Sequence, residues 1–180
     1  MGEKGPNNFT ANAVAAFAGF CAAVLLCVSA CGCGYTFANT PLTEQYRTIA
    51  VPAFKNQTFE PDLQIEFNNI LVRELLNDGR LRVVDDPAVA DLVLTGALTE
   101  YEPYAVSFVE DDEIGQFRIV IMANAALQET RTGETLWQGS DLRGTDFYQT
   151  VAGRSREEAI SSALEELAEL IIFESIDNYW

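Results

Sequence analysis

A chain of 180 residues leaves about 150 for one domain with a hydrophobic core once a leader is removed. The 11 Lys and Arg residues against 27 Asp and Glu residues give a formal net charge of -16. Nucleic-acid binding relies on cations that displace counterions from phosphates, so no nucleic-acid partner is expected. The absence of histidine excludes Ser-His-Asp and Cys-His catalysis and every zinc site that contains histidine.

The first 30 residues predict a segment that is removed from the mature protein. No charged side chain lies between Gly5 and Thr43, and residues 13–30 consist almost wholly of Ala, Val, Leu, Phe and Cys. This run is just long enough for a membrane span of about 20 residues, so a retained anchor and an ordinary secretory signal are alternatives. Its end favours a lipoprotein signal peptide over residues 1–30. The four residues Val28–Cys31 match, position by position, the lipobox of bacterial lipoproteins, whose last residue is the cysteine to be lipidated.

The four cysteines fit lipidation better than redox or metal chemistry. Cys21 and Cys27 belong to the segment that is expected to be removed, and Cys31 becomes the lipidated first residue. Cys33 is the weaker candidate for lipidation, because the residues before it fit the lipobox less well, and it is then left without a partner. A Cys-x-Cys metal site would need two further Cys or His ligands, which the chain does not supply once residues 1–30 are removed. We therefore expect no disulfide, metal or cofactor.

The first part of the mature chain predicts a strand and then a helix. Residues 48–54, TIAVPAF, alternate as in a strand, where Pro52 must lie at an edge or turn its nitrogen away from the neighbouring strand. Pro61 and Asp62 suit the first turn of a helix. Gly79 is expected to end this helix, whose apolar residues recur at helical spacing: Leu63, Phe67, Ile70, Leu71 and Leu75.

Two strands are expected next, a short one from Leu81 and a longer one over residues 90–102, ADLVLTGALTEYE. Gly96, in the middle of the longer strand, indicates a bulge or close packing. The acidic loop Glu110–Glu113 lacks the Asp-x-Asp-x-Asp-Gly spacing of a calcium loop, so a solvated turn is expected there.

Residues 116–129 and 135–148 predict a long hairpin around the turn signal TRTGE, the second strand being less regular. Arg118 projects from the strand face opposite to Ile119, and we expect it to be solvated or paired, because no basic cluster surrounds it.

The last element is an amphipathic helix. Ser155 and Glu158 predict a capping box at its start, followed by one apolar stripe: Ile160, Ala163, Leu164, Leu167 and Ile171. The order of elements predicts an α+β fold, a two-layer sandwich in which two helices pack on one face of a mixed sheet of four to five strands. We expect a single domain over residues 48–180, joined to the lipid by a tether over residues 31–47.

Several segments, in this order, resemble the LptE family of lipopolysaccharide-assembly lipoproteins. They are CGYTF after the leader, TIAVPAFKNQTFEPDLQIEFNNILVRELLNDGRLRVVD, ADLVLTGALTEYE, TGETLW and the closing amphipathic helix. The resemblance covers most of residues 31–177. It implies a lipoprotein, not an enzyme, anchored in the inner leaflet of the outer membrane. Such a protein sits within the LptD β-barrel, helps the barrel assemble and assists the delivery of lipopolysaccharide to the cell surface.

The family register and the lipobox differ by two residues. Family proteins begin the mature chain at the Cys of Cys-Gly-Tyr, which here is Cys33, whereas the lipobox points to Cys31. We prefer Cys31, because the peptidase reads the lipobox directly and a tether tolerates two extra residues at little cost.

A second interpretation stays open. The segment IAVPAFKN and the α+β order also resemble lipoproteins of the LpoB and CsgG type, which activate a cell-wall synthase or build an export pore. The TGETLW hairpin and the lack of a glycine-rich pore segment favour the LptE family. Whether lipopolysaccharide contacts the domain directly also stays open, because a polyanion would need local basic residues or bridging divalent cations on so acidic a chain.

Overall fold

The computed structural model describes residues 45–108, 114–149 and 153–177, which all belong to one compact unit, Asn39–Trp180. The expected signal peptide, the lipidation candidates Cys31 and Cys33 and the acidic loop Glu110–Glu113 lie outside the described residues. Lipidation of Cys31 therefore stays a prediction. Within the described ranges, no helix is both long enough and apolar enough to cross a membrane.

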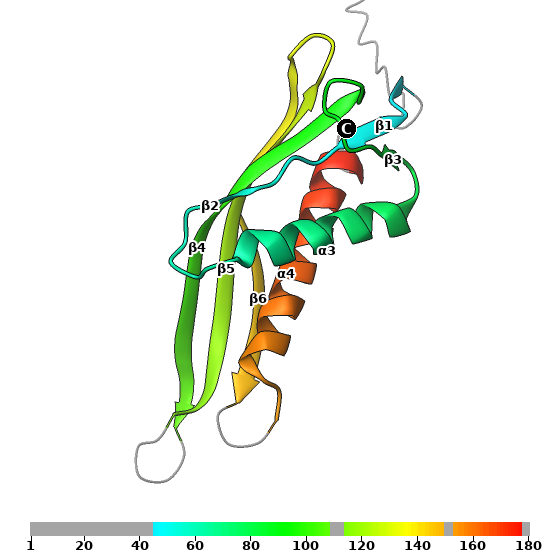
Figure 1. The fold of residues 1–180 in the computed structure, drawn as a ribbon. Coiled ribbons are helices and arrows are strands. Elements are labelled where there is room, and N and C mark those ends of the chain that lie inside the picture. Colours follow the sequence, from blue (N-terminus) through cyan, green and yellow to red (C-terminus); the bar gives the residue numbers. More distant parts are fainter. Residues whose placement is uncertain (1–44, 109–113, 150–152, 178–180) are drawn as a thin grey trace, which may run out of the picture. The chain divides into compact units, whose positions relative to one another are not determined.

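Two helices pack on a mixed sheet, which confirms the predicted α+β fold (Figure 1). The strands follow the order β3-β1-β4-β5-β6, and β2 also pairs with β4. Strand β1 runs parallel to β3 and β4, whereas β4, β5 and β6 form an antiparallel meander. The elements are β1 Thr48–Ala50, β2 Lys55–Asn56, α3 Leu63–Asp78, β3 Arg82–Val83, β4 Leu92–Phe108, β5 Ile114–Glu129, β6 Thr135–Gln149, α4 Arg156–Ile172 and the π-helical turn η2 Phe173–Asp177.

The described part of the chain holds six strands rather than four to five, because the expected strand over residues 48–54 is shortened to β1 and an additional short strand, β2, follows it. Ala50 pairs with Val93 and Lys55 pairs with Ala97, so the chain advances five residues while β4 advances four. Pro52 lies in the part that leaves the sheet, where its missing N–H breaks no ladder bond.

Helix α3 confirms the predicted stripe, since all five of its expected apolar residues are buried. It begins at Leu63 after Asp62, so Pro61 precedes the helix instead of lying in its first turn. Gly79 ends the helix with φ 70°, a left-handed conformation that suits glycine. Helix α4 starts with the predicted capping box: Ser155 Oγ accepts from the Glu158 N–H at 3.2 Å, and the Glu158 side chain accepts from the Ser155 N–H at 2.9 Å.

Both helices bury their apolar stripes against the same side of the sheet (Figure 1). A Cβ on Gly144 of β6 would overlap the carbonyl oxygen of Ala163, so α4 lies directly on this strand. The residues with the largest fully buried side chains come from five elements: Ile49, Phe67, Leu71, Leu75, Leu92, Leu94, Leu98, Ile119, Ile121, Leu127, Leu164 and Leu167.

Two irregularities decide which β4 residues face the core. A Cβ on Gly96 would overlap the Phe54 ring and the Asn124 carbonyl oxygen, so close packing explains this glycine. The bulge lies further along, between Leu98 and Glu100. Because an extra residue reverses the alternation of a strand, Leu98 and Tyr101 both pair with core-facing residues of β5.

Candidate functional site

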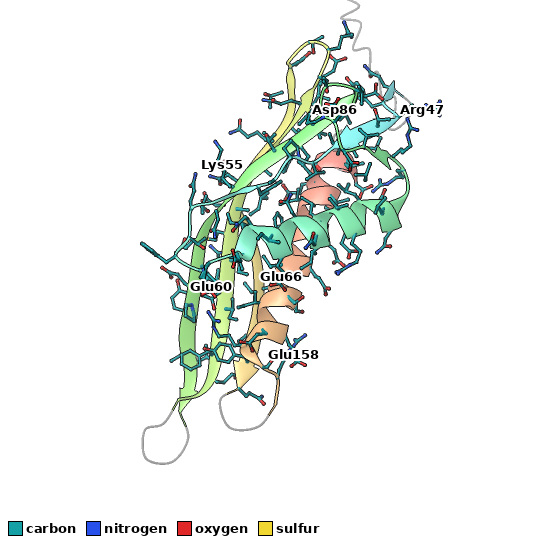
Figure 2. All side chains as sticks on the ribbon, in the orientation of Figure 1. Arg47, Lys55, Glu60, Glu66, Asp86 and Glu158 are labelled. Atoms are coloured by element: carbon teal, nitrogen blue, oxygen red, sulfur yellow. The ribbon has the colours of Figure 1, made fainter. Side chains whose placement is uncertain are left out.

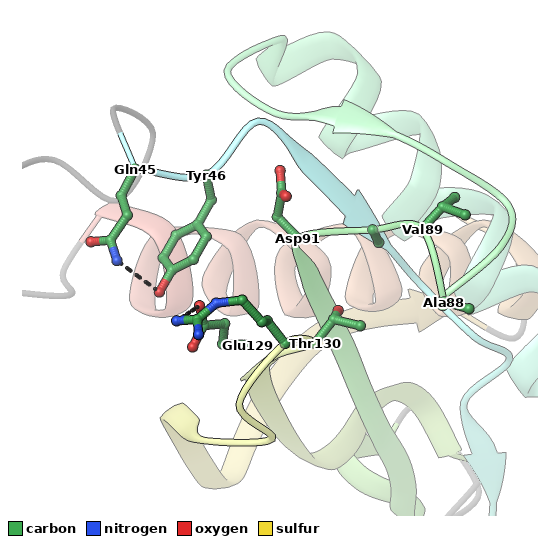
Figure 3. A pocket seen from close by; sticks show the side chains of 9 residues that line it. Gln45, Tyr46, Ala88, Val89, Asp91, Glu129 and Thr130 are labelled. Atoms are coloured by element: carbon green, nitrogen blue, oxygen red, sulfur yellow. Dashed lines mark hydrogen bonds and ion pairs between the residues drawn. The ribbon is translucent and has the colours of Figure 1, made fainter.

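The described residues contain no group of three or more potential metal ligands. A pocket of about 600 Å³ lies where the chain enters β1 and where β4 begins (Figure 3). Both carboxylates that line this pocket, Glu129 and Asp91, accept hydrogen bonds from groups of the protein itself. Glu129 accepts hydrogen bonds from the Thr132 hydroxyl and from the Arg131 guanidinium, both in the turn that follows it.

Asp91, the second carboxylate of this pocket, connects the start of β4 to the start of β1 by hydrogen bonds. One oxygen of Asp91 accepts from the Arg47 N–H, the Thr48 N–H and the Thr48 hydroxyl, each at 2.9 Å. These donors, the Arg47 N–H first among them, hold the pKa of Asp91 below its usual value. The role of Asp91 is therefore structural.

A surface with more capacity for recognition is the sheet face that points away from α3 and α4. Paired residues of an antiparallel sheet point to the same side, so the register defines this surface. We call it the open face, and its central residues form three rows across β4, β5 and β6: Glu100, Met122 and Arg143; Glu102, Val120 and Thr145; Tyr104, Arg118 and Phe147.

The open face changes chemical character from strand to strand. Its β4 column holds the carboxylates of Glu100 and Glu102, its β5 column holds the half-buried apolar side chains of Val120 and Met122, and its β6 column holds the exposed Arg143. A hydrogen bond between the two β4 carboxyls, together with their mutual repulsion, raises the pKa of Glu102. No cation of the described chain forms an ion pair with either of them.

The third row exposes two aromatic rings on either side of a guanidinium. Tyr104 and Phe147 keep 48% and 39% of their surface accessible, and the Arg118 guanidinium lies 5.2 Å from the centre of the Phe147 ring. The outward direction of Arg118 confirms the prediction from the sequence. Its aromatic neighbours come from the strands on both sides, which residue spacing alone does not bring together.

The helix-bearing side differs because carboxylates and internal ion pairs dominate it. Glu60, Glu66 and Glu158 project from the elements on this side (Figure 2). Arg156 of α4 pairs with Glu60 at 2.6 Å and lies 5.5 Å from the centre of the Tyr101 ring. The two helix arginines, Arg73 and Arg156, are therefore paired within the molecule, while Arg118 and Arg143 of the open face form no ion pair among the described residues.

Comparison with known proteins gives one family. A family model described as LptE, lipopolysaccharide-assembly, matches residues 46–174. No curated protein matches the chain.

Three solved structures of bacterial proteins resemble the fold. Protein XCC0632 from Xanthomonas campestris has a TM-score of 0.50 at 12% identity, covering 73% of this chain and 85% of that one. The PelC dodecamer from Paraburkholderia phytofirmans gives 0.48 at 21% identity, with coverages of 71% and 87%. Lipoprotein GNA1162 from Neisseria meningitidis gives 0.45 at 16% identity, with coverages of 73% and 99%. At these identities the likeness concerns the fold alone.

Proposed function

The chain belongs to the LptE family of lipopolysaccharide-assembly proteins, and on this premise we propose that it is an outer-membrane lipoprotein that associates with an LptD-type β-barrel. In this role it assists the assembly of the barrel and the transport of lipopolysaccharide to the outer leaflet. The observation that carries the proposal is the family match over residues 46–174, which spans every described strand and both long helices.

The proposed mechanism is physical and requires no catalysis. The lipid on Cys31 holds the domain at the periplasmic side of the outer membrane and raises its local concentration near the barrel. A single acyl chain gives only marginal anchoring, whereas the two or three chains of a bacterial lipoprotein anchor it stably. The folded domain then supplies a surface that fits the barrel.

Recognition is proposed to depend mainly on the protein contact and less on the glycolipid. The net charge of -16 opposes binding of a polyanion by the isolated domain. Strong, salt-sensitive binding of lipopolysaccharide to the domain in the absence of the barrel would contradict this part of the proposal.

Copurification tests the proposed function directly. The full-length protein, tagged at its C-terminus, is extracted from native outer membranes, and its partners and its N-terminal peptide are identified by mass spectrometry. We expect a complex with a large β-barrel protein that resists SDS, and a diacylglycerol-modified N-terminal cysteine. Capture of a penicillin-binding protein, or a ring-shaped oligomer without a barrel, would instead favour the LpoB or CsgG class.

A further inference from the structure

The turn between β2 and α3 carries the most exposed large apolar side chain of the described residues. The exposed fraction of Phe59 is 106%, whereas the next two values are 68% for Val89 and 61% for Leu76. Figure 1 shows this turn protruding from the body of the domain. Because the whole Phe59 ring is in water, it adds little to the stability of the fold.

Side-chain hydrogen bonds hold this turn in one conformation. The Asn56 side chain accepts from the Thr58 N–H at 3.0 Å and from the Thr58 hydroxyl at 2.8 Å, and it donates to the Glu60 carbonyl at 2.7 Å. The Thr58 hydroxyl also accepts from the Glu60 N–H at 3.2 Å. These bonds connect the residues on both sides of Phe59, so the backbone that carries the ring is ordered in the unbound domain.

Both ends of the turn are attached to the rest of the domain. At its start, the Gln57 N–H donates to the Leu98 carbonyl of β4 at 2.9 Å. At its end, the Glu60 carboxylate pairs with Arg156 of α4 at 2.6 Å. Phe59 therefore has a defined position relative to the sheet and to α4.

A solvated ring on an ordered backbone is suited to binding. Exposure of a single apolar side chain is common at protein surfaces, but here it coincides with a turn that is fixed on both sides of the ring. Transfer of the Phe59 ring into an apolar recess would gain the hydrophobic free energy of its whole surface. The cost of ordering the backbone would already have been met during folding.

The charges near Phe59 favour a protein partner over a lipid surface. The exposed carboxylates of Asp62 and Glu66 follow the ring, and the nearest cation in the sequence is Lys55. Segments that lie on a membrane instead combine apolar side chains with several Lys and Arg residues. A second copy of the chain is disfavoured too, because a formal charge of -16 on each copy opposes self-association.

We propose that Phe59 is an anchor residue by which this domain binds its β-barrel partner, with its ring in an apolar recess of that protein. This inference rests on the proposed function, and it adds one contact residue of the domain. The only property required of the partner is a recess that accepts one aromatic ring. Aromatic side chains that enter such pockets are typical of the residues that dominate interface energies.

The variant Phe59→Ser in the full-length lipoprotein tests the inference. It is purified from native outer membranes, and the barrel that copurifies is quantified by mass spectrometry relative to the lipoprotein. The matched control is Val89→Ser, a similar change at an exposed position between β3 and β4. We expect Phe59→Ser to retain about tenfold less barrel than the wild type, and Val89→Ser to retain the wild-type amount.

A second variant tests whether the order of the turn supports the ring. Asn56→Ala removes three of the hydrogen bonds of the turn, and we expect it to retain less barrel than the wild type but more than Phe59→Ser. The double variant should retain as much as Phe59→Ser alone, because an ordered turn matters only when the ring is present. A further loss in the double variant would contradict the anchor role.

Circular dichroism melting in detergent checks the fold, and Phe59→Ser should melt like the wild type because its ring is solvated. A folded Phe59→Ser that captures as much barrel as the wild type would overturn the anchor while leaving the proposed function intact. Equal losses in Val89→Ser would overturn it too, and a wild-type protein that captures no barrel would overturn both. Wild-type dimers that disappear in Phe59→Ser, with barrel capture unchanged, would assign the ring to a second copy and also overturn the inference.

Discussion

Gly144 shows how one residue sets the distance between the two layers. Its missing side chain lets the Ala163 carbonyl of α4 approach the backbone of β6, and Leu167 contacts the same point. The need for glycine at this position is steric and does not come from the backbone conformation, because Gly144 is not among the glycines with positive φ. A side chain at this position would lift the helix from the sheet and open the core beneath it.

We therefore expect Gly144→Ala to lower the free energy of unfolding by about 1–3 kcal/mol. Urea denaturation followed by circular dichroism measures the change. Ser140→Ala, at an exposed position of the same strand, serves as the control and is expected to stay within about 0.5 kcal/mol of the wild type. An unchanged denaturation midpoint for Gly144→Ala would contradict the close approach of α4.

The Glu100 and Glu102 pair gives a second prediction at this scale. The pKa of Glu102 is raised by its hydrogen bond to the Glu100 carboxyl, so the folded protein binds this proton more tightly than the unfolded chain does. Below the ordinary Glu pKa of about 4.3 both states are protonated, and as pH rises through the raised pKa the folded state is progressively disfavoured. The pair is therefore a source of repulsion at neutral pH.

Replacing Glu100 by Gln removes that repulsion, so the pKa of Glu102 is expected to fall toward its ordinary value. An NMR titration of the side-chain carboxyl carbons measures it, with Glu134→Gln as a variant that should leave Glu102 unaffected. A Glu102 titration curve that is identical in the wild type and in Glu100→Gln would show that the two carboxyls do not interact.

Among the elements, the helices and the hairpin of β5 and β6 followed from the sequence, whereas the pairing of strands that are distant in the chain did not. The stripes of α3 and α4 are contained in one contiguous segment each, and both are buried as predicted. The end of β1 at Ala50 and the start of β2 at Lys55 depend on where β4 offers partners, which is information from residues more than 40 positions away. Short local patterns do not carry such non-local pairings.

The candidate surface was predictable only in part for the same reason. The outward direction of Arg118 follows from strand alternation, but its place beside Tyr104 and Phe147 follows from the register of three strands. The bulge after Leu98 also shifts which β4 residues face outward. The spacing of Leu94, Leu98 and Tyr101 breaks the two-residue period, and this was the one local signal that could have revealed it.

The protection of β6 by α4 gives a prediction at the scale of the element. Glu166→Ala removes the acceptor of the Thr145 N–H and opens part of the sheet edge, so we expect a loss of stability of about 1 kcal/mol and self-association at high concentration. Sedimentation velocity over a range of concentrations measures the association. Glu169→Ala, an exposed change on the same helix, should remain monomeric, and an equally monomeric Glu166→Ala would argue that the edge is protected by other means.

For recognition of a partner by the whole molecule, the distribution of charge matters more than the total charge. The formal charge of -16 includes carboxylates on the open face itself, where Arg118 and Arg143 form no ion pair among the described residues. A lipid at the N-terminus would add membrane attachment to a domain whose described helices do not span a bilayer. On the proposed function, attachment by the lipid and recognition by the folded domain are separable.

Replacing the lipidation candidate tests that separation. We expect Cys31→Ser to abolish the mass increase of the mature N-terminus and to release the protein from membranes, whereas Cys33→Ser should stay lipidated. Intact-mass spectrometry and membrane fractionation measure both properties. Lipidation that persists in Cys31→Ser and is lost in Cys33→Ser would show that the mature chain begins at Cys33, as the family register implies.

The position of β1 has a consequence for the order of folding. This strand is made early, yet it lies between β3 and β4 and depends on Asp91, which is 43 residues after Thr48. The meander of β4, β5 and β6 needs only neighbouring segments, and such local contacts form quickly, whereas distant pairings wait for chain closure. The strand β1 is thus synthesised first but completed late, so a nascent chain that stalls before Asp91 can offer β1 only the two-residue strand β3 and not its partner β4.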